Sequence, residues 1–219
     1  MLPSACLICA QVQREVVCAA CAALLLAPVA RCPRCATPHQ PWNHGHCGAC
    51  ADDDPVDATF ALGDYVEPLD QLVLRLKFGA RLPAAGWIAR QLAARLHARN
   101  VLPDLLVPVP LSPSRLAERG FNQAWEITRP LARQLRVHAS ATALVRRRDT
   151  ASQRTLDLSA RLTNLHHAFA VDDHARLDGL HVGLVDDVMT TGATLREAAR
   201  VLKGRGAVRV TALVALRTP

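Results

Sequence analysis

The sequence contains no hydrophobic run long enough to cross a membrane. Although 50% of its 219 residues are hydrophobic, no stretch approaches the roughly 20 uncharged residues that a spanning helix requires. The N-terminus, MLPSACLIC, also lacks the basic start and the long apolar core of a signal peptide. We therefore expect a chain without a membrane span, located in the cytoplasm.

Aromatic residues and lysines are scarce as well. Phe, Trp and Tyr make up 4% of the chain, which argues against a surface that stacks on successive bases of single-stranded DNA. Lys77 and Lys203 are the only lysines, so arginine carries nearly all of the positive charge. An excess of arginine favours phosphate recognition, because its planar guanidinium binds oxyanions through paired hydrogen bonds. A GC-rich genome would produce the same excess, and the sequence leaves both explanations open.

Cysteine is absent after residue 50, and all eight cysteines before it stand in Cys-x-x-Cys pairs. In a chain without a secretion signal this spacing favours metal over disulfides. Two such pairs supply the four thiolates of one tetrahedral zinc site, so the sequence predicts about two zinc ions. The expected ligands are Cys6, Cys9, Cys18, Cys21, Cys32, Cys35, Cys47 and Cys50.

The order of the pairs favours two consecutive zinc ribbons. The first two pairs would share one ion and the last two pairs the other, while an interleaved arrangement stays open. His44 and His46 lie close by, but with four thiols available for each ion we expect them to be loop residues. A closed four-thiolate site offers no free position to a substrate, so we expect a structural role. A surface for protein or nucleic acid is the alternative.

An acidic, proline-containing break separates the cysteine-rich module from the rest of the chain. We expect a double zinc-ribbon module over residues 1–51, a linker over 52–58 and one larger domain over 59–219. In that domain strand patterns alternate with helix patterns, which predicts an α/β fold whose parallel sheet is covered by helices on both faces. Strands are expected at 59–65, 104–110 and 181–185, helices at 84–98 and within 67–79 and 112–135, and an irregular, lid-like segment at 144–169.

Two adjacent carboxylates precede a turn of small hydroxyl residues in LVDDVMTTGATL, residues 184–195. Asp186 and Asp187 follow the predicted strand 181–185, at the end of a parallel sheet where ligands bind. The turn leads into a helix whose free N–H groups favour an anion. Carboxylates accept hydrogen bonds from hydroxyls and the turn donates them to phosphate, so the stretch predicts a ribose 5-phosphate site. Its phosphate-binding residues would be Thr190, Thr191, Gly192, Ala193 and Thr194.

The same stretch has two other interpretations. A nucleoside triphosphate loop is disfavoured, because the chain has no Gly-Lys-Ser/Thr sequence. In the simplest alternative, Thr191 only caps a helix and the two aspartates form a solvated strand end.

Several sequence blocks resemble known families. VGLVDDVMTTGAT resembles the phosphoribosyl-pyrophosphate signature of type I phosphoribosyltransferases, with Gly183 in place of a larger apolar residue, a change expected to cost packing rather than binding. LKFGA, VPVPLSPSRLAERGFNQA, RRDTASQRTLDLSARLTN and the eight-cysteine start resemble blocks of the ComF family of competence-associated proteins, in the family order. The run Arg119–Gln123 is the most family-specific element. LKFGA departs from the more common form at the residue before the glycine, which weakens the first pyrophosphate-side contacts that the resemblance implies for this block.

This resemblance implies a type I phosphoribosyltransferase-like domain that binds phosphoribosyl pyrophosphate with Mg2+. Asp186 and Asp187 would hold the 2- and 3-hydroxyls of the ribose, and the turn 190–194 its 5-phosphate. Mg2+ would bridge the pyrophosphate and the ribose hydroxyls while keeping several water ligands. The pyrophosphate loop would contain Ser112, Ser114 and Arg115. A flexible hood that closes over the site and excludes water would contain Arg146, Arg147, Arg148, Gln153 and Arg161.

The implied reaction displaces pyrophosphate from C1 of the ribose through an oxocarbenium-like transition state, with carboxylates near the ribose and cations near the leaving group. No clear pocket for an acceptor base is visible, since Phe121 and Trp125 are expected to pack within the fold. Three functions stay open. The chain is a transferase with an unidentified acceptor, a phosphoribosyl-pyrophosphate-binding protein of DNA uptake that handles single-stranded DNA, or a zinc-ribbon adaptor for a competence helicase.

Overall fold

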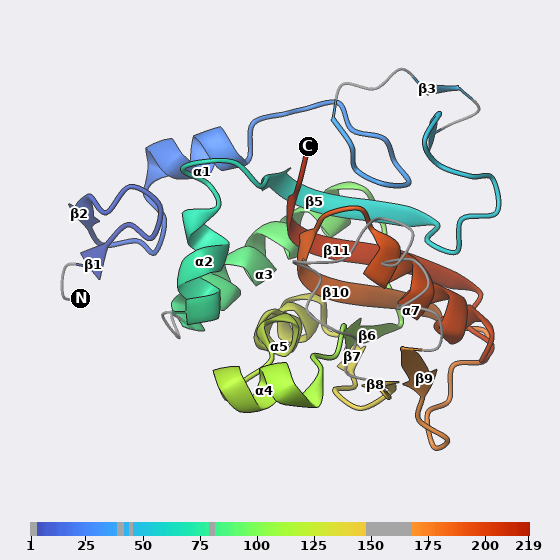
Figure 1. The fold of residues 1–219 in the computed structure, drawn as a ribbon. Coiled ribbons are helices and arrows are strands. Elements are labelled where there is room, and N and C mark those ends of the chain that lie inside the picture. Colours follow the sequence, from blue (N-terminus) through green and yellow to red (C-terminus); the bar gives the residue numbers. More distant parts are fainter. Residues whose placement is uncertain (1–3, 39–41, 44–45, 79–81, 148–167) are drawn as a thin grey trace.

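The computed structural model describes residues 4–38, 42–43, 46–78, 82–147 and 168–219. Its centre is a five-stranded sheet in which all neighbouring strands are parallel, so the predicted α/β class is confirmed (Figure 1). In spatial order the strands are β5 (Ala58–Asp64), β11 (Arg209–Arg217), β10 (His181–Met189), β6 (Leu105–Pro108) and β7 (His138–Ala139).

Three small antiparallel pairs lie outside the central sheet within the described residues. They are β1 (Ser4–Ala5) with β2 (Val12–Gln13), β3 (Trp42–Asn43) with β4 (His46–Cys47), and β8 (Leu144–Arg146) with β9 (Phe169–Val171). The last pair occupies both ends of the segment expected to be irregular, 144–169; its middle, residues 148–167, lies outside the described residues.

Helices cover both faces of the sheet, as expected. On one face lie α2 (Gln71–Phe78), α3 (Leu82–Ala98) and α5 (Gln123–Leu135), and on the other lies α7 (Ala193–Lys203). Along β11, Leu213 and Ala215 join the first hydrophobic cluster, whereas Ala212 and Val214 join the second. Alternate side chains of a strand point to opposite faces, which explains why this strand reads as a continuous apolar run.

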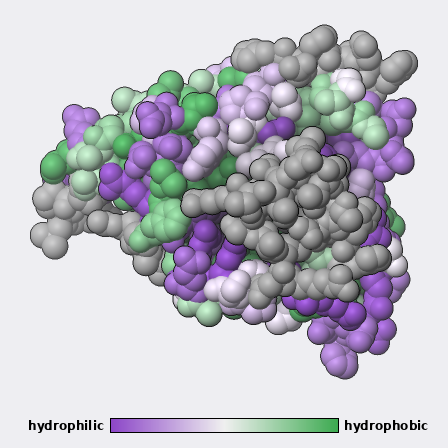
Figure 2. Space-filling view, viewed as in Figure 1, coloured by the Kyte–Doolittle hydropathy of each residue, from purple (hydrophilic) through white to green (hydrophobic). Residues whose placement is uncertain are grey.

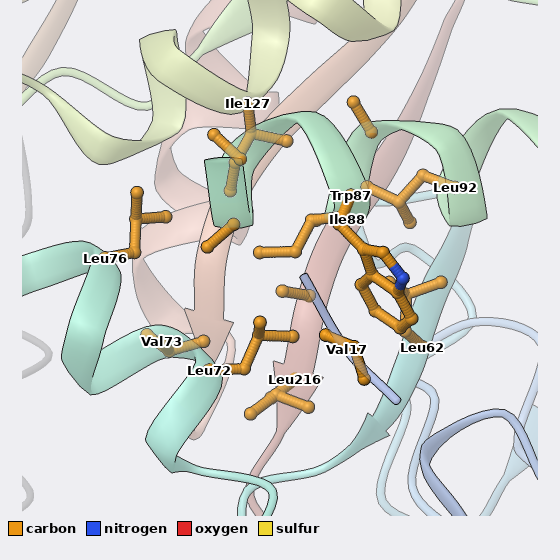
Figure 3. Packing of buried hydrophobic residues seen from close by; sticks show 14 of the residues in the cluster. Val17, Leu62, Leu72, Val73, Leu76, Trp87, Ile88, Leu92, Ile127 and Leu216 are labelled. Carbon is orange, nitrogen blue, oxygen red and sulfur yellow. The ribbon is translucent and has the colours of Figure 1, made fainter. Parts of the chain in front are cut away.

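The first cluster is built from side chains of α2, α3 and α5 against β5 and β11. Figure 3 shows Leu72, Ile88 and Ile127 converging with Leu62 and Leu216. All five side chains are almost fully buried. No helix in the part of the chain that the structure describes is both long and apolar enough to span a membrane.

Residues 112–135 form two helices rather than one. The first, α4 (Pro113–Arg119), ends at Gly120, whose φ of 75° is the left-handed conformation that glycine adopts without strain. The second, α5, starts after Asn122, whose side chain accepts a hydrogen bond from the N–H of Ala124 at 2.9 Å. The family-specific run therefore forms a corner between two helices, not a helix interior.

Gly183 causes no visible packing defect. A β-carbon at this position would lie 2.5 Å from Leu106 Cδ2, 3.0 Å from Pro103 Cγ and 3.2 Å from Leu213 Cδ1. These neighbours already fill the space that a larger residue would need. The expectation that glycine costs packing here is therefore wrong, because the surrounding side chains have taken its place.

The N-terminal segments pack on the β5 edge of the sheet (Figure 1). Thr59 of β5 donates two hydrogen bonds to the cysteine-rich segment, from its N–H to Pro33 O at 2.9 Å and from its hydroxyl to Arg34 O at 2.6 Å. A side chain at Gly63 would collide with Leu25 at the end of α1 (Ala19–Leu25). The cysteine-rich segments thus cover an edge strand that would otherwise be open.

The second half of the expected linker also contacts the domain. Val56 is buried, and the Asp57 carboxylate accepts hydrogen bonds from Val210 N at 2.7 Å and from Lys203 Nζ at 2.8 Å. The boundaries at residues 51 and 58 stay predictions.

Candidate functional site

The eight cysteines gather into two groups of four, and in each group the sulfur atoms lie within 4.8 Å of one another. The first group is Cys6, Cys9, Cys18 and Cys21, and the second is Cys32, Cys35, Cys47 and Cys50. The consecutive pairing favoured by the sequence is therefore the one observed, and the interleaved arrangement is not.

The spacing of the sulfur atoms fits a tetrahedral metal site. In the second group the Sγ atoms of Cys35 and Cys47 are 3.6 Å apart, those of Cys47 and Cys50 3.7 Å, and those of Cys32 and Cys50 3.9 Å. Four thiolates around zinc at about 2.3 Å would be separated by about 3.8 Å, whereas a disulfide bond is about 2.05 Å long. The residues therefore suit zinc.

Backbone N–H groups prepare one thiol of each group for metal binding. Burial raises the pKa of Cys6, but the backbone N–H groups of Cys18, Cys9 and Ile8 oppose it and bring this pKa down to about 6. In the second group burial again raises the pKa of Cys32, and backbone N–H groups, led by that of Cys47 at 3.2 Å, lower it to about 7. The thiolate is the form that binds metal.

The histidines near the second group are not ligands where the structure describes them. Both ring nitrogens of His46 are occupied, Nδ1 by Cys47 O and Nε2 by Asp52 Oδ1, each at 2.9 Å. His44 lies outside the described residues.

The two aspartates lie inside β10 rather than directly after it. The sequence placed the end of the strand at Val185, but pairing with β11 continues to Met189. The pairing of β10 with β6 does end at Val185, because β6 stops at Pro108. Asp186 and Asp187 therefore project past the carboxyl end of β6, where a parallel sheet forms a crevice.

A cavity of about 290 Å3 opens at this point. Its polar wall combines residues from β10, the turn after it, α2, the α4–α5 corner and β8. These are Lys77, Arg115, Arg119, Asn122, Gln123, Arg146, Asp186, Asp187, Thr190 and Thr194, together with Tyr65. Four cations thus share one cavity with two carboxylates, which suits a ligand carrying several negative charges and hydroxyl groups.

The carboxylates are electrostatically unequal. Lys77 Nζ forms an ion pair with Asp187 Oδ2 at 3.1 Å, although this buried oxygen has no hydrogen bond of good geometry among the described residues. Burial, and next the charge of Asp187, raise the pKa of Asp186 to about 7, against the opposing effects of the Asp187 N–H and of Lys77. A cation or a hydroxyl-bearing ligand that compensates this charge would therefore favour ionised Asp186.

The turn after β10 is tight and leads directly into α7. Gly192 adopts a φ of 79° and caps α7, and a β-carbon there would lie 2.5 Å from Met189 Cε. Thr190 and Thr194 line the cavity. Thr191 accepts a hydrogen bond from Ala193 N at 3.4 Å through its hydroxyl and one from Arg196 Nη2 at 2.7 Å through its carbonyl, so it supports the turn.

The other expected site residues divide between the cavity and its frame. Arg115 lines the cavity, whereas Ser112 is buried and caps α4 by accepting from Arg115 N at 3.4 Å, with Ser114 Oγ 3.0 Å away. Arg146 lines the cavity and lies 5.5 Å from the centre of the Phe169 ring. Arg147 is exposed, its N–H donates to Ala168 O at 2.9 Å, and it does not line the cavity. Arg148, Gln153 and Arg161 lie outside the described residues.

Sequence reasoning assigned no site role to Arg119, Asn122 or Gln123, and it included Lys77 only through the pyrophosphate-side contacts expected of LKFGA. All four residues line the cavity. The signal was present, because Arg119–Gln123 and LKFGA both stood out as family blocks. The corner between α4 and α5 at Gly120 was not predicted, and this corner brings the run Arg119–Gln123 to the cavity.

Among the described residues, no large exposed hydrophobic side chain lines the cavity, although the centre of the exposed Phe78 ring lies 5.6 Å from the guanidinium carbon of the cavity residue Arg119. In Figure 2 hydrophobic surface gathers on the left, over the N-terminal cysteine segment and α2. Val12, Leu24, Val66 and Phe78 are the large apolar residues exposed in this part of the chain.

Residues 82–219 match the phosphoribosyl transferase domain family. The chain belongs to this family. It is 36% identical over 210 residues to the DNA utilization protein YhgH of Escherichia coli strain K12, covering 92% of this chain and 90% of that protein. It is 36% identical over 172 residues to Competence protein F of Haemophilus influenzae, covering 74% and 73%. These relatives confirm the ComF resemblance.

Among solved structures, the purine phosphoribosyltransferase from Pyrococcus horikoshii Ot3 is 17% identical and covers 61% of this chain and 82% of that chain, with a TM-score of 0.39.

Proposed function

We propose that the chain binds phosphoribosyl pyrophosphate with Mg2+ in the cavity at the carboxyl end of β10. The observation that carries the proposal is that Asp186 and Asp187 share one cavity with Thr190 and Thr194 and with four cationic side chains, those of Lys77, Arg115, Arg119 and Arg146. A ribose 5-phosphate that carries pyrophosphate presents the matching groups, namely a diol, a monophosphate and a diphosphate.

The site residues take distinct roles in this proposal. Asp186 and Asp187 accept hydrogen bonds from the ribose hydroxyls. Thr190 and Thr194 donate to the 5-phosphate at the start of α7, where the helix dipole favours an anion. Arg115 and the hood residues Arg146, Arg147 and Arg148 contact the pyrophosphate.

The carboxylate pair also suits a hard cation. Mg2+ prefers oxygen ligands, and Asp187 Oδ2 is a buried carboxylate oxygen that Lys77 contacts at 3.1 Å without a hydrogen bond of good geometry. When bound, Mg2+ would supply positive charge that stabilises the departing pyrophosphate. The chain itself would supply Arg115, Arg146 and Lys77 for the same purpose and would orient the ribose through its two aspartates.

We further propose that residues 1–51 form a module with two structural zinc ions, joined through residues 52–58 to the domain over 59–219. The sulfur geometry of the two cysteine groups supports this assignment. A closed set of four thiolates leaves no open position on the metal, so the ions would stabilise the fold.

The biological role proposed is in DNA uptake or DNA use. It is supported by relatives named DNA utilization protein and Competence protein F, and single-stranded DNA and a competence helicase are its candidate partners. The alternative is an active transferase with an unidentified acceptor. Phe121 and Trp125 are only partly exposed and do not line the cavity, so neither supplies an evident acceptor platform.

The proposal is tested by thermal unfolding with and without ligand. Phosphoribosyl pyrophosphate and Mg2+ at about one hundred times the dissociation constant should stabilise the folded chain by about 2.7 kcal/mol. Competition with single-stranded DNA in the same samples separates a small-molecule site from a nucleic-acid surface. An unchanged melting temperature at millimolar ligand contradicts the proposal.

A further inference from the structure

The Gln123 side chain has an unpaired hydrogen-bond donor in the wall of the cavity that we propose binds phosphoribosyl pyrophosphate. It is the first residue of α5, only 2% exposed, and it lines the cavity. Its side-chain Nε2 is buried and has no hydrogen-bond partner among the described residues. A buried donor without an acceptor is costly, so its presence in a cavity indicates that a ligand supplies the acceptor.

The position of Gln123 is held by its neighbour. Asn122 Oδ1 accepts from Ala124 N at 2.9 Å and thereby starts α5, while Asn122 Nδ2 donates to Val109 O at 3.1 Å. The start of α5 is therefore tied to the backbone just past the end of β6. This tie keeps the Gln123 side chain at the cavity instead of in solvent.

The surroundings of Gln123 select the chemistry of the missing acceptor. Arg115 and Arg119 come from the adjoining helix α4 and line the same cavity. The amino end of the 13-residue α5 adds the positive end of a helix dipole. The acceptor is therefore an oxyanion. In the proposed function the turn 190–194 holds the 5-phosphate, which leaves the pyrophosphate for the α4–α5 corner.

We infer that the side-chain amide of Gln123 donates a hydrogen bond to a pyrophosphate oxygen of bound phosphoribosyl pyrophosphate. Gln123 thereby makes the cavity distinguish phosphoribosyl pyrophosphate from ribose 5-phosphate. The inference rests on the proposed function and adds a specificity-determining residue to it.

The test is the substitution Gln123→Met in the zinc-loaded, full-length chain. Methionine has a similar volume and no donor. Calorimetric titrations with phosphoribosyl pyrophosphate plus Mg2+, and with ribose 5-phosphate, should show a loss of about tenfold for the first ligand and no change for the second. The ligand-free variant should melt at the same temperature as the wild type or higher, because an unsatisfied buried group has been removed.

Gln134→Met is the matched control, since Gln134 lies on the same helix and is exposed. It should leave both affinities unchanged. Equal binding of phosphoribosyl pyrophosphate by wild type and Gln123→Met overturns the inference alone. The inference is also overturned if Gln123→Met loses affinity equally for both ligands, because Gln123 would then bind the sugar phosphate. It is overturned as well if the ligand-free variant melts at a lower temperature, because Gln123 would then be a structural residue. If the wild type binds no phosphoribosyl pyrophosphate, the proposed function fails as well.

Discussion

The cysteine groups and the aspartate pair both suit a cation, but they are organised in opposite ways. Each cysteine group is closed and contains a thiol whose pKa is lowered, to about 6 for Cys6 and about 7 for Cys32. The aspartate pair faces a cavity, is already paired with Lys77, and contains a carboxyl whose pKa is raised to about 7 in Asp186. The first arrangement suits a permanent metal, and the second suits a ligand that arrives and leaves.

The two kinds of site are in contact through the second cysteine group. Arg217 at the end of β11 donates to Cys35 O at 3.1 Å, and β11 pairs there with Met189, the last residue of β10. Asp54, which follows this cysteine group, lies 3.7 Å from Arg196, and Arg196 supports the phosphate turn through Thr191 O. Contacts of Asp54 and Arg196 therefore link the segment after the second cysteine group to the turn 190–194.

Removal of zinc gives the largest expected effect. The cysteine groups belong to the two hydrophobic clusters that cover the two faces of the sheet, so their loss should destabilise the whole chain. We expect metal analysis to find about two zinc ions and a strong chelator to lower the melting temperature by more than about 10 °C. Added zinc should restore it. A melt unaffected by chelation would show that the cysteines do not support the fold.

The next largest effect should come from pH. Because the folded-state pKa of Asp186 is about 7 against an ordinary 3.8, the folded chain holds a proton that the unfolded chain releases. Stability from this group is therefore greatest below pH 3.8 and falls as pH rises toward 7. Ligand binding changes in the opposite direction. Affinity for phosphoribosyl pyrophosphate and Mg2+ should rise about tenfold per pH unit below 7 and then level off.

Calorimetric titrations between pH 5.5 and about 8 measure this slope. Asp186→Asn removes the titrating carboxyl and is the control. In this variant the affinity for phosphoribosyl pyrophosphate should no longer show the pH dependence assigned to Asp186. A wild-type slope that persists unchanged in Asp186→Asn would assign the titration to another group.

The smallest effect should come from the contact between the two sites. Asp54→Asn removes the ion pair with Arg196, which is long at 3.7 Å, while the asparagine oxygen can still accept the hydrogen bond from Val56 N. The melting temperature should hardly change, while affinity for phosphoribosyl pyrophosphate should fall about two- to fivefold as the turn loses support. Asp173→Asn removes the exposed Arg205–Asp173 pair at 3.3 Å and serves as the control. Equal affinities in both variants would mean that the two sites are independent.

The parts of this arrangement that are local in sequence could be predicted. Each Cys-x-x-Cys pair, and the stretch from Asp186 to Thr194, places its own residues together whatever the rest of the chain does. The alternation of strand patterns with helix patterns likewise predicted the parallel sheet. The extension of β10 to Met189 was missed because it depends on the partner strand β11, which continues to Arg217.

The parts that depend on distant segments could not be predicted. Lys77 of α2 precedes Asp187 by 110 positions in the chain. The two side chains form an ion pair only because the fold brings the end of α2 close to the end of β10. Gln123 reaches the cavity only because Gly120 breaks the helix and Asn122 starts a new one. Neither contact follows from the periodicity or the charge of its own segment.

The central claim is tested most directly by calorimetric titration with phosphoribosyl pyrophosphate in the presence of Mg2+. The titration compares the wild type with the double variant Asp186→Asn, Asp187→Asn. We predict saturable binding by the wild type and a loss of about a hundredfold in the variant, because two carboxylates no longer accept from the ribose hydroxyls. No heat with the wild type, or equal affinity in both proteins, would contradict the assignment of this cavity as the donor site.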